Sequence, residues 1–157
     1  MSLLGIISDT HDNLDKVRSA VALFNKLAVD QVVHCGDVVA QFVLAELSRL
    51  KAPVAGVFGN CDGDRGALLQ RARQFGFAWQ DAPYSFSVGG KRLVVTHQPV
   101  ARVPGCDFYL HGHTHKHGYQ PGRPAVINPG EACGWLTGRA TVATLDTDSG
   151  AVDFIDL

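Results

Sequence analysis

The chain has 157 residues, of which 46% are hydrophobic and 18% charged, so we expect residues 1–157 to fold as one domain. Its formal net charge of −1 and its lack of a long basic run make nucleic acid an unexpected partner, and its apolar runs are too short to span a membrane. The N-terminus lacks the basic region and the cleavage site of a signal peptide, so we expect a cytoplasmic protein.

The first half of the sequence alternates between two kinds of apolar pattern. Short, continuous apolar runs predict buried strands, and apolar residues at spacings of three and four predict helices with one buried face. In chain order the predicted elements are a strand at 3–8, a helix at 14–27 capped by Asp12 or Asn13, a strand at 31–34, a helix at 39–50, a strand at 53–57 and a helix at 65–75. This alternation predicts right-handed βαβ units and a parallel sheet.

The second half is dominated by strands, with no clear helix between Pro99 and Asp107. Gly89 and Gly90 lie between two of these strands and are a strong hairpin signal, because each tolerates positive φ. The predicted strands cover 84–88, 92–96, 108–110, 125–127, 140–145 and 151–155, the last two forming a second hairpin. The expected fold class is therefore α/β, with two packed mixed β-sheets flanked by helices on the outer faces.

Four of the seven histidines lie in the segment 110–117, which we place in a loop at the carboxyl end of a strand, where open α/β sheets bind ligands. Four other predicted strands also end in Asp, His or Asn. The side chains so placed are Asp9, His11, Asp37, Asn60, His97, His113 and His115. This mixture suits Mn²⁺, Fe or Zn²⁺ better than Ca²⁺ or Mg²⁺, and seven ligands are too many for one tetrahedral ion. We therefore expect two metal ions that share one carboxylate.

The motifs at these strand ends follow the order found in a known family. They are Asp9-x-His11, Gly36-Asp37, Gly59-Asn60, His97 and Gly112-His113-x-His115. Together they resemble the motifs of the calcineurin-like metallophosphoesterase superfamily. The segments 59–62 (Gly-Asn-Cys-Asp) and 128–130 (Asn-Pro-Gly) resemble its small single-domain, YfcE-like phosphodiesterases. The resemblance spans residues 3–131 and implies the αββα sandwich of that superfamily.

The resemblance also implies a role for each ligand, position by position. Two divalent ions would be bound, with Mn²⁺ expected and Fe, Zn²⁺ or Ni²⁺ as alternatives, and a hydroxide between them would attack phosphorus. The first ion would be held by Asp9, His11 and His115, and the second by Asn60, His97 and His113, with Asp37 bridging them. The implied activity is that of a metal-dependent phosphoric ester hydrolase, foremost a phosphodiesterase that acts on a small phosphate ester.

The position after Asn60 departs from the pattern of the family. Many members carry a histidine there, which is thought to protonate the leaving group, whereas this chain has Cys61. A thiol is a poor substitute, so substrates with good leaving groups should be favoured. Asp62 is a candidate catalytic helper beside Asp37 and Asn60, although we favour a turn or helix-cap carboxylate as its role.

Other singled-out residues have plain structural interpretations. We expect His34 in the core or behind a metal ligand, Arg65 on the surface rather than against a phosphate, and Asn128 in a structural turn. The four cysteines are widely spaced and are expected to be reduced thiols, with disulfides or a zinc–thiolate site as the alternative.

Two other functions stay open at this point. A scaffold of the same fold would bind protein partners, as the retromer scaffold subunit of the superfamily does, but it would have no need for all seven ligands. A nuclease would act on nucleic acid, against which the net charge near zero argues. The oligomeric state is also open, with a homodimer or a higher oligomer as options.

Overall fold

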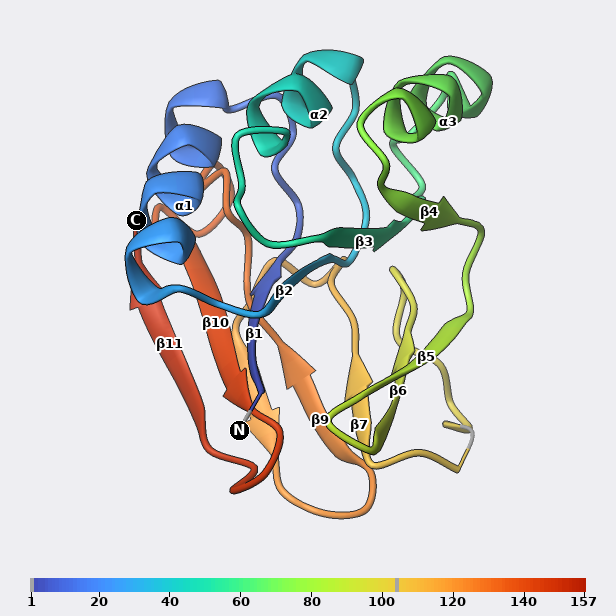
Figure 1. Cartoon of the computed structure of the whole chain (residues 1–157), viewed down its shortest axis with the longest axis vertical. Coiled ribbons are helices and arrows are strands. Elements are labelled where there is room, and N and C mark those ends of the chain that lie inside the picture. The colour runs from blue at the N-terminus through green and yellow to red at the C-terminus, as the bar shows by residue number, and fades with distance from the viewer. Residues whose placement is uncertain (1, 104) are drawn as a thin grey trace.

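The computed structural model describes residues 2–103 and 105–157, which form two mixed β-sheets flanked by three helices (Figure 1). The six-stranded sheet has the strand order β11 (Val152–Asp156), β10 (Thr141–Asp146), β1 (Leu3–Ile7), β2 (Gln31–His34), β3 (Val54–Val57) and β4 (Ala78–Gln80). The five-stranded sheet has the order β5 (Tyr84–Val88), β6 (Lys91–Val95), β7 (Phe108–Leu110), β9 (Ala125–Asn128) and β8 (Gly118–Gln120). The predicted α/β class with two packed mixed sheets is confirmed.

The helices α1 (Leu14–Leu27), α2 (Gln41–Leu47) and α3 (Arg65–Gln74) connect the four parallel strands β1 to β4. Helix α1 has the predicted bounds, and Asn13 caps it by accepting a hydrogen bond from the backbone N–H of Lys16 at 3.4 Å. The parallel βαβ units predicted for the first half are therefore confirmed.

Helix α2 is shorter than the predicted range of 39–50. Val39 has a φ of 77°, which is incompatible with a right-handed helix, and its N–H donates to Asp62 Oδ1 at 2.8 Å. The contact with a residue 23 positions away therefore excludes Val39 from the helix that local apolar spacing predicted.

The sequence patterns missed two short strands. Strand β4 has Trp79 as its one buried residue, and all three residues of β8 are exposed. Each strand is only three residues long, which is too short for an alternating or continuous apolar pattern to identify it. By contrast, the predicted hairpin is confirmed, because Gly89 and Gly90, with φ of 57° and 75°, connect the antiparallel strands β5 and β6.

The core forms two main layers, on opposite faces of the six-stranded sheet. Ile6 packs between the two sheets with residues such as Leu110, whereas its neighbour Ile7 packs against the helices, as the two-residue period of a strand requires. All three helices contribute to that helix-side layer and cover the same face of the six-stranded sheet (Figure 1).

The outer face of the five-stranded sheet is covered differently. In the described part of the chain no helix follows Gln74, and this face packs Val94 and Tyr109 against Val103 and Cys106 of the loop that precedes β7. The helices of the described residues therefore flank the sandwich on the side of the six-stranded sheet. Within residues 2–103 and 105–157, none of the helices is both long and apolar enough for a membrane crossing.

Candidate metal centre

All seven predicted ligands lie where strands of the two sheets end. Asp9, Asp37 and Asn60 follow the parallel strands β1, β2 and β3 of the six-stranded sheet. His97 follows β6, and the pair His113 and His115 follows β7, two parallel strands of the five-stranded sheet. The carboxyl ends of both sheets therefore contribute to one site, as expected for ligand binding in α/β folds.

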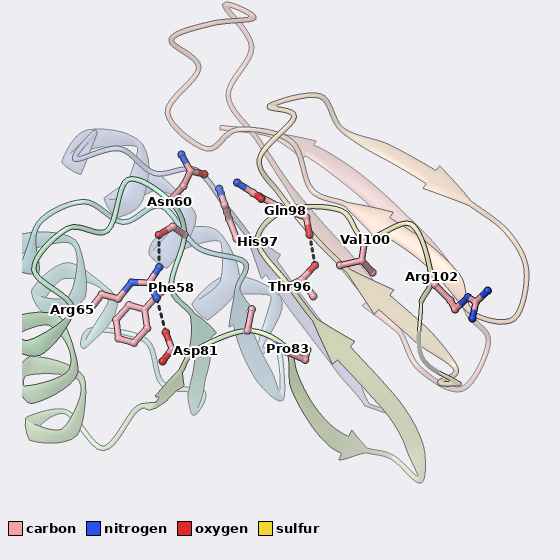
Figure 2. A pocket seen from close by; sticks show the side chains of 12 residues that line it. Phe58, Asn60, Arg65, Asp81, Pro83, Thr96, His97, Gln98, Val100 and Arg102 are labelled. Atoms are coloured by element: carbon pink, nitrogen blue, oxygen red, sulfur yellow. Dashed lines mark hydrogen bonds and ion pairs between the residues drawn. The ribbon is translucent and has the colours of Figure 1, made fainter.

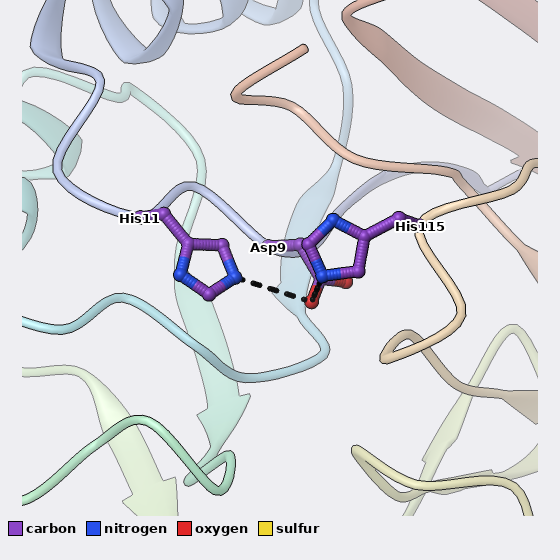
Figure 3. Close-up of side chains that lie close together, drawn as sticks. All are labelled: Asp9, His11 and His115. Carbon is purple, nitrogen blue, oxygen red and sulfur yellow. Dashed lines mark ion pairs between the residues drawn. The ribbon is translucent and has the colours of Figure 1, made fainter. Parts of the chain in front are cut away.

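We name Asp9, His11 and His115 the first triad. Asp9 Oδ1 lies 3.6 Å from His11 Nε2 and 3.4 Å from His115 Nε2, and Figure 3 shows both imidazoles beside the carboxylate. The other oxygen, Asp9 Oδ2, accepts hydrogen bonds from Ser8 Oγ at 2.7 Å and from the N–H of His113 at 3.1 Å. One carboxylate oxygen is thus used to fix the side chain, and the other faces the imidazoles.

Asp37 lies between the first triad and the remaining ligands. Its Oδ2 is 3.4 Å from His11 Nε2 and 3.2 Å from His97 Nε2, while its Oδ1 accepts a hydrogen bond from the N–H of Cys61 at 2.8 Å. Burial raises the pKa of Asp37, but the hydrogen bonds and charge of His97 and the amide of Cys61 outweigh this effect and lower it to about 2. The ionised carboxylate of Asp37 therefore directs Oδ2 towards both His11 and His97.

We name Asn60, His97 and His113 the second triad. His113 Nδ1 lies 2.9 Å from Asn60 Oδ1 and 3.3 Å from His97 Nε2. His97 Nδ1 donates to the carbonyl oxygen of Cys35 at 2.8 Å, since a carbonyl only accepts. This bond fixes the ring and leaves Nε2 unprotonated in the neutral form, which is the arrangement found behind metal-binding histidines.

The backbone of the site is strained. Five of the seven predicted ligands have a positive backbone φ, which residues other than glycine rarely adopt. They are Asp9 (50°), His11 (37°), Asp37 (61°), His113 (68°) and His115 (62°). Each such residue costs on the order of 1–3 kcal/mol and persists only where the surrounding structure holds it. Strain concentrated at these positions indicates that the fold is organised to present these side chains.

The residues fit the two metal ions that the resemblance implies. Asp9 Oδ1 and His11 Nε2 are buried, yet neither has a hydrogen-bond partner among the described residues. Ligand atoms lie within 4.8 Å of one another both in the first triad and in the set of Asp9, Asp37 and His97. Buried polar atoms without a partner are costly, and cations placed among these atoms would satisfy them.

Glu131 is a part of the site that the sequence analysis missed. It is fully buried, and its Oε2 accepts a hydrogen bond from His115 Nδ1 at 2.6 Å, so Nε2 of that ring faces Asp9. Its Oε1 accepts from the N–H and the hydroxyl of Thr137, both at 2.6 Å. Burial raises the pKa of Glu131, but the bonds from Thr137, His115 and Leu136 outweigh it and lower the pKa to about 2. The one feature of the sequence that could have identified Glu131 as part of the site is its position as an acidic residue just after β9.

The candidate helper Asp62 is occupied by backbone amides. Its Oδ2 accepts from the N–H groups of Gly59 at 2.7 Å and Asp37 at 3.1 Å, and its Oδ1 accepts from Val39 at 2.8 Å. The side chain is 2% exposed, and burial raises its pKa. These contacts favour a structural role for Asp62 in the turn over a role as proton donor, because its carboxylate connects the loop after β2 to the loop after β3.

Two glycines next to predicted ligands lie so close to other residues of the site that a side chain would not fit there. A side chain at Gly59 would collide with the Asp37 carboxylate, and one at Gly112 would collide with Ser8 Oγ and lie 2.7 Å from Asp9 Oδ2. The glycines that precede Asn60 and His113 in the sequence motifs therefore allow the loops of the two sheets to approach the central carboxylates.

The supporting residues lie as the sequence suggested. Asn128 holds the histidine loop by donating to Thr114 Oγ1 at 2.8 Å and to the carbonyl of Gly112 at 3.1 Å. His34 is fully buried with Nε2 3.2 Å from Thr10 Oγ1, and burial lowers its pKa to about 3, so it is a neutral core histidine. All four cysteines are free thiols, and Cys61 is the exposed one.

A cavity of about 680 Å³ opens beside the second triad (Figure 2). Asn60 and His97 contribute to its wall, and so does Arg65, which we expected on the surface. Arg65 is exposed, as expected of a surface residue, but it also pairs with Asp81 at 2.6 Å and lies over the ring of Phe58, so it is held at the cavity. Its place in the wall therefore differs from that of a free surface arginine.

The fold and the ligand cluster together define a phosphoesterase of the class that the motifs indicated. The family model described as the calcineurin-like phosphoesterase superfamily domain matches residues 1–150, and the chain belongs to this superfamily. The predicted family is thereby confirmed.

Individual relatives agree with this assignment. A phosphodiesterase of Methanocaldococcus jannaschii is 35% identical over 154 residues, which cover 92% of this chain and 93% of that protein. A solved archaeal phosphodiesterase superposes with a TM-score of 0.89 at 33% identity and covers 99% of both chains. The YfcE phosphoesterase of E. coli has a TM-score of 0.75 at 22% identity, with 98% of both chains covered, and supports the fold.

Proposed function

We propose that this chain is a phosphodiesterase that uses two divalent metal ions, one held by the first triad and one by the second, with Asp37 shared between them. The observation that carries the proposal is the position of Asp37 Oδ2, which lies 3.4 Å and 3.2 Å from imidazole nitrogens of His11 and His97. The similarity to a phosphodiesterase of Methanocaldococcus jannaschii and to a solved archaeal phosphodiesterase supports the diester as substrate class.

The chemistry follows from the charge of the site. When bound, the ions lower the pKa of a shared water from about 15.7 to about 7, so a bridging hydroxide is the nucleophile we propose, and they attract the anionic ester. Asp9 and Asp37 supply two negative charges, which leaves the loaded site positive towards a phosphodiester. Mn²⁺ is the ion we propose, with Fe, Zn²⁺ or Ni²⁺ as alternatives, because both triads offer imidazole nitrogen with carboxylate or amide oxygen.

At the position after Asn60 this chain offers a leaving group only a weak acid. Cys61 occupies the position after Asn60, and partial desolvation of its thiol together with the charge of Asp37 raises its pKa above the usual value, although the residue as a whole is exposed. A thiol that holds its proton so firmly is a weak donor. We therefore propose that the enzyme acts on small diesters with good leaving groups, in the cytoplasm, where the four free cysteines suit the reducing conditions.

The test compares hydrolysis of bis-p-nitrophenyl phosphate and p-nitrophenyl phosphate by the purified protein with and without Mn²⁺. We expect metal-dependent turnover of the diester above that of the monoester. His115→Ala should abolish it, because the first triad loses a ligand. His117→Ala should not, because that histidine of the same loop packs on Phe154, with 5.0 Å between ring centroids, and belongs to neither triad.

A scaffold would give a different result. Protein that is folded and metal-loaded, yet hydrolyses neither ester with any of the four metals, would contradict the proposal and favour the scaffold. Turnover that survives in His115→Ala would contradict the assignment of the first triad.

A further inference from the structure

The cavity beside the second triad has a firmly held wall. Val100 donates its N–H to the hydroxyl of Tyr109 at 3.0 Å, and that hydroxyl lies 2.6 Å from Thr96 Oγ1. The Thr96 hydroxyl donates in turn to the carbonyl of Gln98 at 2.7 Å. Tyr109 is 1% exposed, so a buried side chain fixes the loop that follows His97. The cavity is therefore a preformed feature of the fold and not a gap between free loops.

Arg65 gives this cavity a flat charged surface. Its guanidinium carbon lies 5.3 Å from the centre of the Phe58 ring, and Phe58 is 6% exposed. Asp81 holds one nitrogen at 2.6 Å, and the carbonyl of Gly59 accepts from another at 3.4 Å. With one face on Phe58 and its nitrogens tied at the edge, the guanidinium has its other face available to a ligand. Guanidinium planes stack on planar rings in this way.

The described lining of the cavity carries two arginines and one aspartate. Arg65 is paired with Asp81, and Figure 2 shows Arg102 directed away from the other labelled side chains. The remaining wall includes the apolar side chains of Pro83 and Val100, the latter 42% exposed. Arg65 therefore offers a second phosphate no unpaired charge, and Arg102 points elsewhere, whereas an uncharged ring would bury apolar surface against Pro83 and Val100. The cavity thus suits an uncharged substituent.

We infer that this cavity is the subsite for one ester substituent of the substrate, that the substituent is an uncharged planar ring, and that Arg65 determines this preference by stacking on it. The inference rests on the proposed function, because Asn60 and His97 link the cavity to the second triad. It goes further by naming the class of diester, one with an aryl or heteroaromatic group.

The test uses phenyl phosphate and methyl phosphate as competitive inhibitors of bis-p-nitrophenyl phosphate hydrolysis. Each has a single substituent, so the ratio of their inhibition constants reports how well the cavity accepts a ring. We expect phenyl phosphate to bind about tenfold more tightly than methyl phosphate. Arg65→Lys keeps the charge but loses the plane, and it should reduce this ratio about fivefold while the constant for methyl phosphate changes little.

The chain offers a matched control on the same helix. Arg71 lies over Phe75 at 4.7 Å, outside the cavity, so Arg71→Lys removes an equivalent pair and should leave the ratio unchanged. Val100→Asn tests the opposite wall without touching Arg65 and should also lower the ratio. It remains informative if the Arg65 variant does not fold.

The outcomes distinguish a failure of the proposed function from a failure of the proposed subsite. A wild-type protein that hydrolyses no ester contradicts the proposed function. An active enzyme with equal constants for both inhibitors, or with a ratio that neither Arg65→Lys nor Val100→Asn lowers, overturns the subsite alone. An equal loss in Arg65→Lys and Arg71→Lys would also overturn it, because the effect would then come from the helix and not from the cavity.

Discussion

The two triads differ in what lies behind them. In the first triad, His115 is backed by the fully buried Glu131, and the side chains of His11 and His115 are 17% and 14% exposed. The second triad borders the cavity, and its Asn60 is exposed, although its His97 is 3% exposed. A ligand set with a carboxylate behind it is suited to retaining an ion, whereas one that opens to a cavity is suited to exchanging a substrate. We therefore propose that the first triad serves metal retention and the second triad substrate access.

Asp37 belongs to both sides, so its replacement should have the largest effect. Asp37→Asn removes the shared charge, and we expect hydrolysis to fall by more than about 100-fold, beyond the range seen when residues behind the ligands are changed. Metal content per chain should fall as well, measured by elemental analysis after gel filtration. Asp15→Asn, at an exposed aspartate that pairs with Arg18, is the control. Unchanged metal content and hydrolysis in Asp37→Asn would end the shared-carboxylate model.

Glu131→Gln should separate the two triads. The variant weakens the partner of His115 Nδ1, so affinity at the first triad should fall about 10- to 100-fold while the second ion is retained. Isothermal titration calorimetry of the metal-free protein with Mn²⁺ would show that one of the two sites has a lower affinity. Glu46→Gln alters another poorly exposed glutamate, which pairs with Arg18 and Arg49 and not with a predicted ligand, and should leave both affinities unchanged. An equal loss of Mn²⁺ affinity at both sites would contradict the proposed difference between the two triads.

Asp62→Asn tests whether this residue positions loops or donates a proton. Loss of its charge weakens bonds to three backbone amides and should reduce the free energy of unfolding by about 1–3 kcal/mol. Turnover should fall by similar factors for bis-p-nitrophenyl phosphate and diphenyl phosphate, which differ in their leaving groups. A much greater loss on diphenyl phosphate would instead identify Asp62 as the proton donor. Asp64→Asn, at the exposed cap of α3, controls for loss of a nearby carboxylate.

The smallest effect concerns acid stability of the metal-free protein. Glu131 has a folded pKa of about 2 against an ordinary value of 4.5, so its ionised form stabilises the fold above pH 4.5. This contribution is lost as the pH falls from 4.5 towards 2, because the unfolded chain takes up the proton first. Urea midpoints should therefore decline over this window more steeply in the wild-type protein than in Glu131→Gln. Parallel declines would show that Glu131 is not a strong acid in the fold.

Local patterns predicted what depends on neighbours in sequence. Helix α1 has its predicted bounds because its apolar spacing and its Asn13 cap act within a few residues. The seven predicted ligands could be singled out because each follows an apolar strand. Helix α2 was overpredicted at Val39 because the competing bond comes from Asp62, on another loop.

The sequence by itself determined the family, the α/β class and the residue types of a metal centre, since motifs and periodicity are written along the chain. Only the tertiary structure showed that Glu131 backs His115 across 16 positions, and that Arg65, Asp81 and Phe58 form one wall of a cavity. These relations arise because the βαβ crossovers and the sheet packing bring separate loops to one edge. Contacts between residues so far apart in sequence produce no periodic pattern or fixed spacing from which they could be predicted.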